Sequence, residues 1–600
     1  MTENEQLLQN LIQNCSEETA KAFFRRKNVH FKAQNEALEN ADPERFSNIW
    51  KIGRLDFEAD TVVFAFAEVK ADLSERTCRK AQFEAARKIL RAENADAGLF
   101  LFKGANGAFR LSLVYKAYQG TKAELSPYRR FTYFVQPDST GNTTFKRQID
   151  RCAFDSLEAI KQAFSIEAVS KEFYRELSNW YFWALKHIHF PKQNNLSDAE
   201  RNPVCTIRLI TRLMFVWFMK QMKLIPDGLF DRENVSRMLQ SLEPDESTYY
   251  KAVLQNLFFA TLNTEMDNPK VPRRFRYKNE QGGDGHFGIH NVYRYEELFS
   301  KPDTALELFK TVPFLNGGLF ECLDRVEIKP YVRIDGFSDR KDNELTVPNF
   351  LFFGGEHIED LSESYGDTKR KKEKVSGLLD ILSRYNFTVI ENTPHESEVA
   401  LDPELLGMVF ENLLAAYNPE TGATARKQTG SFYTPREIVS YMVDESLIAY
   451  LKTALQSEIG NQKSEIESRL RDLLSYDAEG NPFNESETGA LIAAVDACKI
   501  IDPACGSGAF PMGVLHKLVL ILSKLDPGNE GFLQKQIEKL DDVILRDELT
   551  RNFKENYDDY GRKLCLIENC IYGVDIQPIA CQISKLRFFI SLLCDQKTDA

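Results

Sequence analysis

The segment from Ile500 to Phe510 constrains the fold of this chain more than any other. It begins with apolar residues, reaches an acid at Asp502, and turns at Gly506 and Gly508 before an apolar helical pattern starts. A buried strand, a glycine turn and a helix in this order predict a βα unit with a ligand site at the turn. Because glycine has no Cβ and tolerates positive φ, a ligand can approach the backbone of the turn closely. The turn is too short for a phosphate-binding loop that ends in Gly-Lys-Ser/Thr.

Further along the chain, a second apolar stretch also ends in an acid. The run from Cys570 to Val574 is followed by Asp575, and a helical pattern then spans Ala580 to Leu593. An acid at the end of such a strand accepts hydrogen bonds from the ribose hydroxyls of a nucleoside cofactor. The two strand–acid–helix segments therefore predict a βαβ unit with a nucleoside-binding site.

Upstream of both strands, a short polar and aromatic segment leads into an amphipathic helix. It consists of Thr429-Gly430-Ser431-Phe432-Tyr433-Thr434-Pro435, with Thr434 as the expected N-cap and Pro435 as the expected first helical residue. Over about residues 396–600, these three segments together resemble the S-adenosylmethionine (AdoMet)-dependent DNA adenine-N6 methyltransferases. The first motif of that family has the form Asp-Pro-x-x-Gly-x-Gly-x-Phe, and its Phe/Tyr-Tyr-Thr-Pro segment closes over the methionine end of AdoMet.

The resemblance implies roles for particular residues of this chain. Asp502, Gly506 and Gly508 would shape the methionine side of the cofactor site, and Asp575 would bind the ribose. The other cofactor-binding positions implied by the motifs are Phe432, Tyr433, Thr434, Ala504 and Ile576. Asp575 lies much farther beyond the glycine turn than the ~20 residues usual for such units. We therefore expect a helical insertion near residues 529–556. The polar and charged stretch at 456–484 is interpreted as a second insertion, between the Phe-Tyr-Thr-Pro segment and the first motif. Cys505 is expected to be a small buried residue rather than a nucleophile.

Near the N-terminus, a charged hairpin predicts a metal site. Asp56 lies near the end of one strand, and Glu68 and Lys70 share a face of the next, because side chains two apart in a strand point the same way. We expect the short turn to bring Asp56 toward Glu68 and Lys70, with Asp60 as an alternative first ligand. Two carboxylates and a lysine can hold Mg²⁺ and activate water for phosphodiester cleavage. The pattern resembles the PD-(D/E)xK nucleases, although an exposed edge strand with alternating charge would give the same string.

Three regions differ in their sequence patterns. Residues 1–150 combine a single N-terminal helix with strands predicted at 52–57, 61–70, 98–102, 109–115 and 130–135. Residues 151–395 are mainly helical, and residues 396–600 contain the methyltransferase motifs. This order resembles the layout of type IIG restriction–modification enzymes. The expected fold class is multidomain α/β: a PD-(D/E)xK-like α/β domain, a helical connector, and the start of a Rossmann-like AdoMet-dependent methyltransferase sheet.

Composition leaves the question of DNA binding open. The net charge is −13, but DNA binding depends on local clusters of Lys and Arg. The chain shows no secretory signal, and the charged residues within 206–224 favour a buried helix over a membrane span. Its eleven cysteines include no Cys-x-x-Cys pair, so neither a zinc site nor a disulfide framework is predicted, and a cytoplasmic location is expected. The candidate phosphate-contacting runs are Arg25–Lys27, Arg129–Arg130, Arg273–Lys278 and Lys369–Lys372.

These patterns predict a protein that methylates adenine N6 in double-stranded DNA with AdoMet and also cleaves DNA with Mg²⁺. The alternatives are a methyltransferase without nuclease activity, as in phage defence, and a non-catalytic subunit that binds AdoMet and DNA. The family's acceptor loop, Asn/Asp-Pro-Pro-Tyr/Phe, is absent from the sequence. We therefore expect that loop and a target-recognition domain to come from a longer polypeptide or a partner subunit. The helix at 580–593 would then expose apolar positions to strands supplied from outside.

Overall fold

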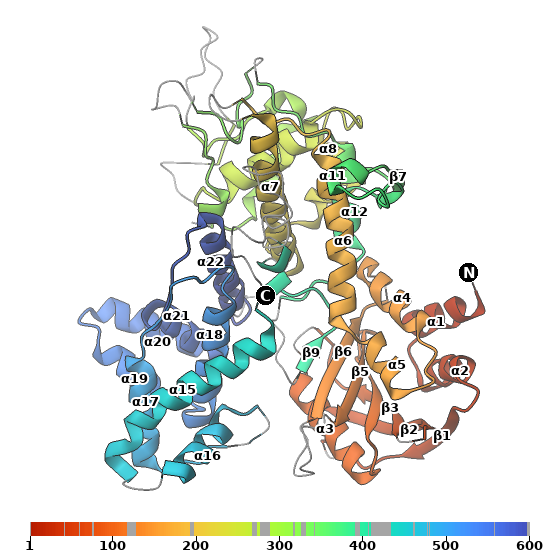
Figure 1. Ribbon diagram of the computed structural model, residues 1–600, viewed down its shortest axis with the longest axis vertical. Helices are drawn as coiled ribbons and strands as arrows, with labels where there is room; N and C mark the ends of the chain where they lie inside the picture. Colours follow the sequence, from red (N-terminus) through yellow and green to blue (C-terminus); the bar gives the residue numbers. More distant parts are fainter. Residues whose placement is uncertain are drawn as a thin grey trace. The chain divides into compact units, whose positions relative to one another are not determined.

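A computed structural model gives the fold as two compact units (Figure 1). Unit 1 comprises Met1–Leu177 and Leu379–Asp402, and unit 2 comprises Ser178–Leu378 and Pro403–Ala600. The structure describes the chain with several gaps. It covers 2–596 except 41, 59, 75–76, 117–127, 138, 193–196, 267–272, 276–288, 316–317, 326–331, 341–342, 390–395, 406, 410–433, 460–462, 477, 479 and 557.

Unit 1 is built on a seven-stranded mixed sheet in the order β1-β2-β3-β4-β5-β6-β9. Neighbouring strands are antiparallel, except that β3 pairs with β4 and β6 pairs with β9 in parallel. The parallel β3–β4 pair requires a crossover, which α3 supplies. The strands are β1 (Lys32–Ala37), β2 (Phe46–Asp56), β3 (Thr61–Val69), β4 (Ala97–Lys103), β5 (Phe109–Lys116), β6 (Tyr128–Val135) and β9 (Glu396–Glu398).

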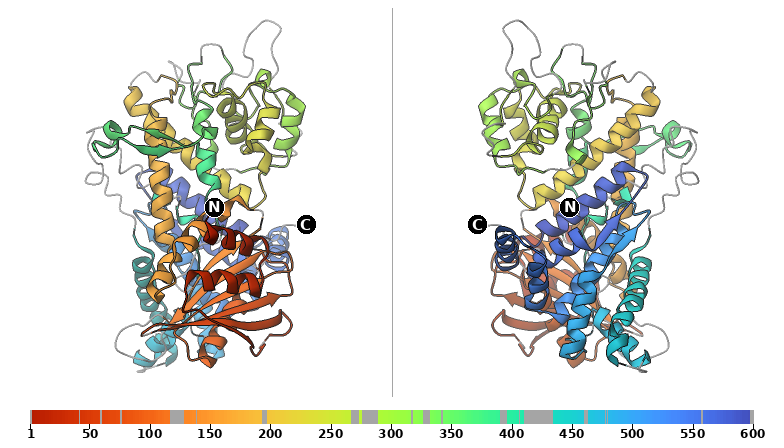
Figure 2. Two further views of the ribbon diagram at one scale, coloured as in Figure 1. Left: turned by 90° about the vertical axis from the view of Figure 1, so that its right-hand side faces the viewer. Right: turned by 90° about the vertical axis from the view of Figure 1, so that its left-hand side faces the viewer.

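Helices cover both faces of this sheet (Figure 2). Val63 and Ala65 of β3 pack against the apolar stripe of α3, whereas Phe64 points to the other face and meets Phe24 of α2, with ring centroids 4.8 Å apart. This alternation explains why β3 is apolar on both faces. The helices of this unit are α1 (Glu3–Gln13), α2 (Glu17–Lys27), α3 (Arg79–Ala92), η1 (Thr140–Asn142), α4 (Thr143–Arg151) and α5 (Leu157–Ala163), while α6 (Ile166–Ala184) and α12 (Leu378–Ser383) continue across the unit boundary.

The first part of unit 2, residues 178–378, is mostly helical. Its central helix, α7 (Asp198–Gln221), is buried on all sides over most of its length, including the charged side chains of Arg201 and Arg212. A small antiparallel hairpin joins β7 to β8. The other elements are η2 (Asp227–Leu229), α8 (Arg232–Met238), the π-helix η3 (Tyr249–Thr261), η4 (Glu296–Leu298), α9 (Pro302–Lys310), η5 (Gly318–Phe320), α10 (Phe350–Phe353), β7 (His357–Glu359), α11 (Ser362–Tyr365) and β8 (Glu373–Val375).

The second part of unit 2 packs helices around a two-stranded parallel sheet. Strand β10 (Ile500–Asp502) pairs with β11 (Ile571–Gly573), so that Asp502 lies opposite Gly573. One apolar cluster joins α15, α16, α17 and α18 beside these strands. The helices are α15 (Arg436–Ile459), α16 (Lys463–Leu474), α17 (Glu485–Ala497), α18 (Ala509–Leu525), α19 (Glu530–Glu538), α20 (Val543–Glu555), α21 (Asp558–Asn569) and α22 (Pro578–Leu593).

The mixed α/β class is confirmed, whereas the PD-(D/E)xK and Rossmann-like assignments and the three-domain division stay predictions. The segment near residues 529–556 is helical and forms α19 and α20, and α16 lies within residues 456–484, while the assignment of both segments as insertions stays a prediction. The single N-terminal helix predicted for the first residues is wrong: Ser16 caps a new helix, so the segment forms α1 and α2. Among the described residues, no helix combines the length and the apolar character needed to cross a bilayer.

Candidate functional site

The glycine turn between β10 and α18 has the backbone geometry that its sequence predicts. Gly506 and Gly508 have φ of 52° and 88°, and the Gly508 amide donates to the Cys505 carbonyl at 2.8 Å. A Cβ at Gly508 would lie 2.5 Å from Oγ of Ser584 on α22. Gly508 therefore meets two demands that only glycine satisfies without strain: a left-handed conformation and close packing.

Asp502 ends β10 with one carboxylate oxygen engaged and the other free. Its Oδ1 accepts a hydrogen bond from the Ala504 amide at 3.0 Å, which holds the side chain against the turn. Its Oδ2 is buried and has no hydrogen-bond partner within the described parts of the chain. A buried carboxylate oxygen without a donor is costly, because it has lost water and gained no replacement. This oxygen is the place in the turn where a ligand with an N–H or O–H donor fits.

Asp575 lies across the same turn from the neighbouring strand. Its Oδ2 accepts from the Gly506 amide at 2.9 Å, and its Oδ1 accepts from the Gln577 amide at 2.7 Å. Backbone bonds from Val574 to Asp502 and from Cys505 to Val574 join the two strand ends. The two acids predicted for the cofactor site are thus brought together at the carboxyl edge of the β10–β11 pair, where ligands of parallel sheets bind.

The other predicted cofactor positions are placed only in part. Phe432 and Tyr433 lie outside the described residues. Thr434 is described, but α15 begins at Arg436, and the Pro435 carbonyl accepts the first helical bonds, one residue later than expected. Ala504 is exposed, and Ile576 is 90% exposed.

Cys505 is buried inside the turn, as expected. Burial raises the pKa of its thiol to about 12, and the nearby Cys581 and Asp575 act in the same direction. A thiol with so high a pKa is protonated at neutral pH and is a poor nucleophile. The structure therefore supports the expectation that Cys505 is a packing residue.

The N-terminal hairpin does not bring Asp56 to Glu68 and Lys70, so that expectation is wrong. Asp56 pairs with Thr61 beside the turn, whereas Glu68 lies seven residues further along β3. At about 3.3 Å per residue, the two carboxylates are roughly 20 Å apart. The physical reason is the antiparallel register: the end of β2 faces the start of β3. Asp56 instead bonds to Lys32 and Arg54, and Asp60 lies in the same turn.

Glu68 and Lys70 lie at the other end of the hairpin, beside the start of β2. Asn48 donates to Oε2 of Glu68 at 3.3 Å, and the ammonium group of Lys70 donates to the Pro43 carbonyl at 2.8 Å. Asp42, next to Pro43, is therefore an acid at the same end of the hairpin as Glu68. Arg45 donates to its carboxylate and holds the pKa of Asp42 below its usual value. Only the hairpin register identifies Asp42, so sequence reasoning missed it.

A buried charge cluster in unit 1 was not predicted at all. Arg130 of β6 donates to Glu396 of β9 at 3.1 Å, and Arg79 of α3 donates to the same carboxylate at 2.8 Å. Burial alone would raise the pKa of Glu396, but the two arginines hold it below its usual value. Burial raises the pKa of Glu398 despite the nearby arginines. These partners are hundreds of residues apart in the sequence, and no local pattern reveals them.

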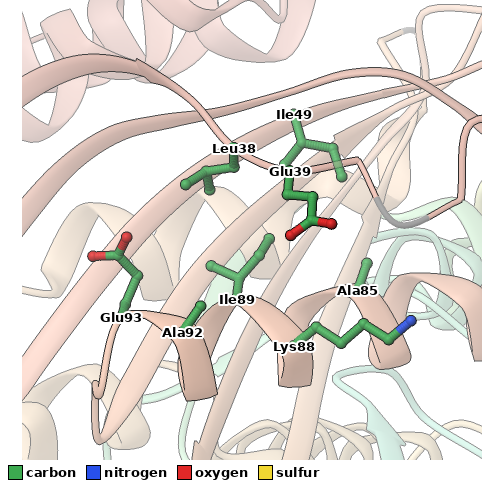
Figure 3. A pocket seen from close by; sticks show the side chains of 8 residues that line it. All are labelled: Leu38, Glu39, Ile49, Ala85, Lys88, Ile89, Ala92 and Glu93. Carbon is green, nitrogen blue, oxygen red and sulfur yellow. The ribbon is translucent and has the colours of Figure 1, made fainter.

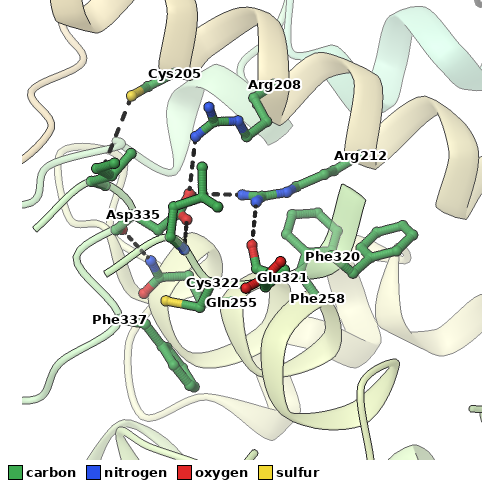
Figure 4. Close-up of polar contacts among 12 residues, drawn as sticks. Cys205, Arg208, Arg212, Gln255, Phe258, Phe320, Glu321, Cys322, Asp335 and Phe337 are labelled. Atoms are coloured by element: carbon green, nitrogen blue, oxygen red, sulfur yellow. Dashed lines mark hydrogen bonds and ion pairs between the residues drawn. The ribbon is translucent and has the colours of Figure 1, made fainter. Parts of the chain in front are cut away.

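A group of potential metal ligands in unit 2 is better explained by a structural role, in which Asp324 binds the backbone of a neighbouring loop. The ligand atoms of His290, Cys322 and Asp324 lie within 4.8 Å of one another, and no other such group of three occurs among the described residues. The Asp324 carboxylate, however, already accepts four backbone amides, from residues 334 to 337. Asp335 in turn bonds to Arg212 at 2.8 Å (Figure 4). Because these bonds occupy the Asp324 oxygens, the group provides little oxygen coordination for a cation.

Two of the predicted phosphate-contacting arginines have internal roles. Arg130 is fully buried in the charge cluster, and Arg273 donates to the carbonyls of Thr261, Thr264 and Val312. Neither guanidinium is therefore available to DNA. Lys369, Lys371 and Lys372, beside the β7–β8 hairpin, are exposed and keep that role as a prediction.

Unit 1 also has a cavity of 360 Å³ between α3 and the β1–β2 strands (Figure 3). Ile49 and Ala85 help to form its apolar floor, whereas Glu68 points to the opposite face of the sheet. The cavity is thus separate from the candidate nuclease residues. Its lining residues are Leu38, Glu39, Ile49, Ala85, Lys88, Ile89, Ala92 and Glu93.

Comparison with known proteins gives one informative similarity. The chain is 28% identical over 401 residues to a protein of Methanocaldococcus jannaschii that is named as a type II restriction enzyme and methyltransferase, an assignment its name marks as unproven. The matched region covers 66% of this chain and 26% of that relative, so the chain corresponds to about a quarter of its length. No family model matches the chain. No solved structure matches it either.

Proposed function

We propose that the second part of unit 2 binds AdoMet for the methylation of adenine N6 in double-stranded DNA. The observation that carries the proposal is the buried, unpartnered Oδ2 of Asp502 beside a glycine turn that Asp575 closes from the next strand. AdoMet has donors that suit both acids, namely its ammonium group and its ribose hydroxyls. Bound AdoMet would supply an electrophilic methyl group, and the named residues would hold and orient it.

The similarity to the M. jannaschii relative supports this proposal, because a methyltransferase is part of that protein's name. Adenine in a duplex is stacked and paired, so the target base has to leave the helix before its amino group reaches the methyl donor. The acceptor loop that would contact this base is not in the sequence. We expect it to come from polypeptide outside these 600 residues, together with the target-recognition domain.

The test is AdoMet binding to the full 600-residue chain, measured by titration calorimetry. Asp502→Asn and Asp575→Asn should each weaken binding roughly tenfold to a hundredfold, the loss expected for one or two hydrogen bonds to a charged group. Asp541→Asn makes the same chemical change at an exposed position of the same unit and should leave the affinity unchanged. Equal affinity in all four proteins would remove the site. Binding by the wild-type chain would also distinguish a protein that binds AdoMet from one that does not.

A second activity, Mg²⁺-dependent DNA cleavage by unit 1, is favoured by a specific observation. Glu68 lies near the end of β3, Lys70 directly follows that strand, and Asp42 lies at the same end of the hairpin. A carboxylate pair with a lysine is suited to hold Mg²⁺ and activate water. The revised candidate set is therefore Asp42, Glu68 and Lys70, without Asp56.

Cleavage of unmodified DNA with Mg²⁺ tests this set. Glu68→Gln should abolish cleavage and leave AdoMet affinity unchanged, because the two sites lie in different units. Asp56→Asn, which removes a carboxylate from the far end of the same hairpin, should cleave at the wild-type rate. If only Asp56→Asn loses cleavage, the revised set is wrong. If the wild-type protein binds AdoMet and cuts no DNA, the alternative of a methyltransferase without nuclease activity is supported.

A further inference from the structure

The brace, defined here as residues 403–405 and 407–409, packs directly against the glycine turn of the candidate cofactor site. Gly407 lies so close to Ser507 that a Cβ at this position would overlap both Oγ and Cβ of the serine. Ser507 is the residue between the two turn glycines and is 1% exposed. Because Ser507 is buried in close-packed surroundings, its side chain cannot move into solvent to relieve such an overlap.

The opposite side of Ser507 is also fixed. Its carbonyl accepts a hydrogen bond at 3.1 Å from Arg587 on α22, and that arginine is 2% exposed. Ser507 is thus held between the brace and α22. A displacement of Ser507 toward α22 would disturb a buried charged group, so the turn has little freedom to accommodate a larger residue at 407.

The same brace reaches the start of α15. Glu404 forms an ion pair with Arg436, the first residue of that helix, and the carboxylate side chain is only 12% exposed. Arg436 follows Thr434 and Pro435 directly, which end the segment predicted to close over AdoMet. A mostly buried ion pair fixes the position of a chain more firmly than an exposed one, because its loss leaves a charge without a partner in a poorly solvated place.

Packing within unit 2 connects these two contacts. Val439 and Val443 of α15 belong to the same buried cluster as Met512 and Leu515 of α18, the helix that follows the glycine turn. The brace therefore links two parts of unit 2: Gly407 packs against the glycine turn, and Glu404 pairs with the first residue of α15. Leu405 and Val409, 3% and 2% exposed, anchor the brace itself.

We propose that the brace sets the distance between the glycine turn and the start of α15, next to the predicted cofactor position Thr434, with Gly407 and Glu404 as positioning residues for AdoMet. The inference rests on the proposed AdoMet site and adds to it two residues outside the family motifs. Neither residue contacts the cofactor in this proposal. Each acts through a neighbour, Gly407 through Ser507 and Glu404 through Arg436.

The first test is the AdoMet affinity of Gly407→Ala, measured by calorimetry well below the melting temperature of each protein. We expect at least a tenfold loss, because the added methyl group displaces Ser507 and with it the turn. Gly489→Ala is the matched control: it places the same methyl group within helix α17, where no atom of the described residues lies within 4 Å. It should bind AdoMet as the wild type does.

A second test does not depend on a crowded core position. Glu404→Gln should weaken AdoMet binding several-fold, and the double exchange Glu404→Arg with Arg436→Glu should restore most of it. Hydrogen exchange gives a readout besides affinity: AdoMet should protect the amides of residues 436–440 in the wild type and less so in Glu404→Gln. A residue that only stabilised the fold would lower the melting temperature of these variants without changing ligand-dependent protection.

The outcomes separate this inference from the function on which it rests. If wild-type protein does not bind AdoMet, the proposed function fails. If Asp502→Asn loses affinity while Gly407→Ala and Glu404→Gln keep it, the proposed function stands and the brace is overturned. Loss of affinity in Gly407→Ala and in Glu404→Gln, with recovery in the double exchange, supports the brace.

Discussion

Gly508 shows how one residue can serve both the fold and the candidate site. Its φ of 88° lies in the left-handed region, and the nearest side chain, Ser584, occupies the space that a Cβ would need. Asp502 adds a second single-residue feature, a buried oxygen that receives no hydrogen bond from the described residues. At this scale the sequence was informative, because the glycines and the acid of the first motif each have a local physical reason to be there.

Gly508→Ala should abolish measurable AdoMet binding and lower the melting temperature. The left-handed conformation alone costs a non-glycine residue about 1–2 kcal/mol, and the overlap with Ser584 adds to that. Gly366→Ala separates the two effects, because Gly366 also has a positive φ, 62°, but nothing lies within 4 Å of its Cβ position. This control should be destabilised through conformation alone and bind AdoMet normally. Calorimetry and thermal unfolding of both variants give the comparison.

At the scale of elements, the alternation of apolar residues predicted the strands that have an apolar face. It did not predict strands rich in charged residues. The predicted strands from 52 to 135 correspond to β2–β6, because each presents a regular apolar face to helices. Strand β9, Glu396-Ser397-Glu398, was missed, since its charges are compensated by arginines of β6 and α3 that only the fold brings near. The register of β2 and β3 was also beyond a local pattern, and this produced the wrong partner for Glu68.

The buried charge cluster of Arg79, Arg130, Glu396 and Glu398 should contribute strongly to the stability of unit 1. Glu396→Gln leaves the buried Arg130 without a full counter-charge, and breaking such a pair costs about 3–5 kcal/mol. Because Arg130 and Arg79 lower the pKa of Glu396, its contribution is present at neutral pH and is lost as the pH falls through that lowered pKa. Denaturant unfolding of unit 1 at neutral and acidic pH should show the difference between wild type and variant shrinking in acid.

Glu167→Gln is the matched control for that measurement. Glu167 pairs with Lys171 in the same unit, but both side chains are about three-quarters exposed, at 76% and 75%. Exposed pairs of this kind contribute about 0–1 kcal/mol. A loss of stability in Glu167→Gln as large as that in Glu396→Gln would mean that the buried cluster has no special role.

For the whole molecule, the candidate cofactor site lies among residues that are partly exposed. Strands β10 and β11 form a sheet of two, and Ile501, Tyr572 and Val574 beside the site are 65%, 45% and 54% exposed. The sequence has no Asn/Asp-Pro-Pro-Tyr/Phe loop to accept hydrogen bonds from an adenine amino group and to stack on the flipped base. The chain also aligns with only 26% of the relative that is named as a methyltransferase.

We therefore predict that the 600-residue chain binds AdoMet but does not by itself methylate DNA. The physical reason is that cofactor binding needs only the glycine turn and the two acids, whereas transfer also needs groups that hold the flipped adenine in line with the methyl group. The measurement is transfer of tritiated methyl to adenine-containing duplex DNA, with AdoMet binding confirmed in the same preparation. Adding a polypeptide that carries the acceptor loop and a target-recognition domain should restore transfer. Sustained turnover by the chain alone would show that other residues of these 600 build the acceptor side.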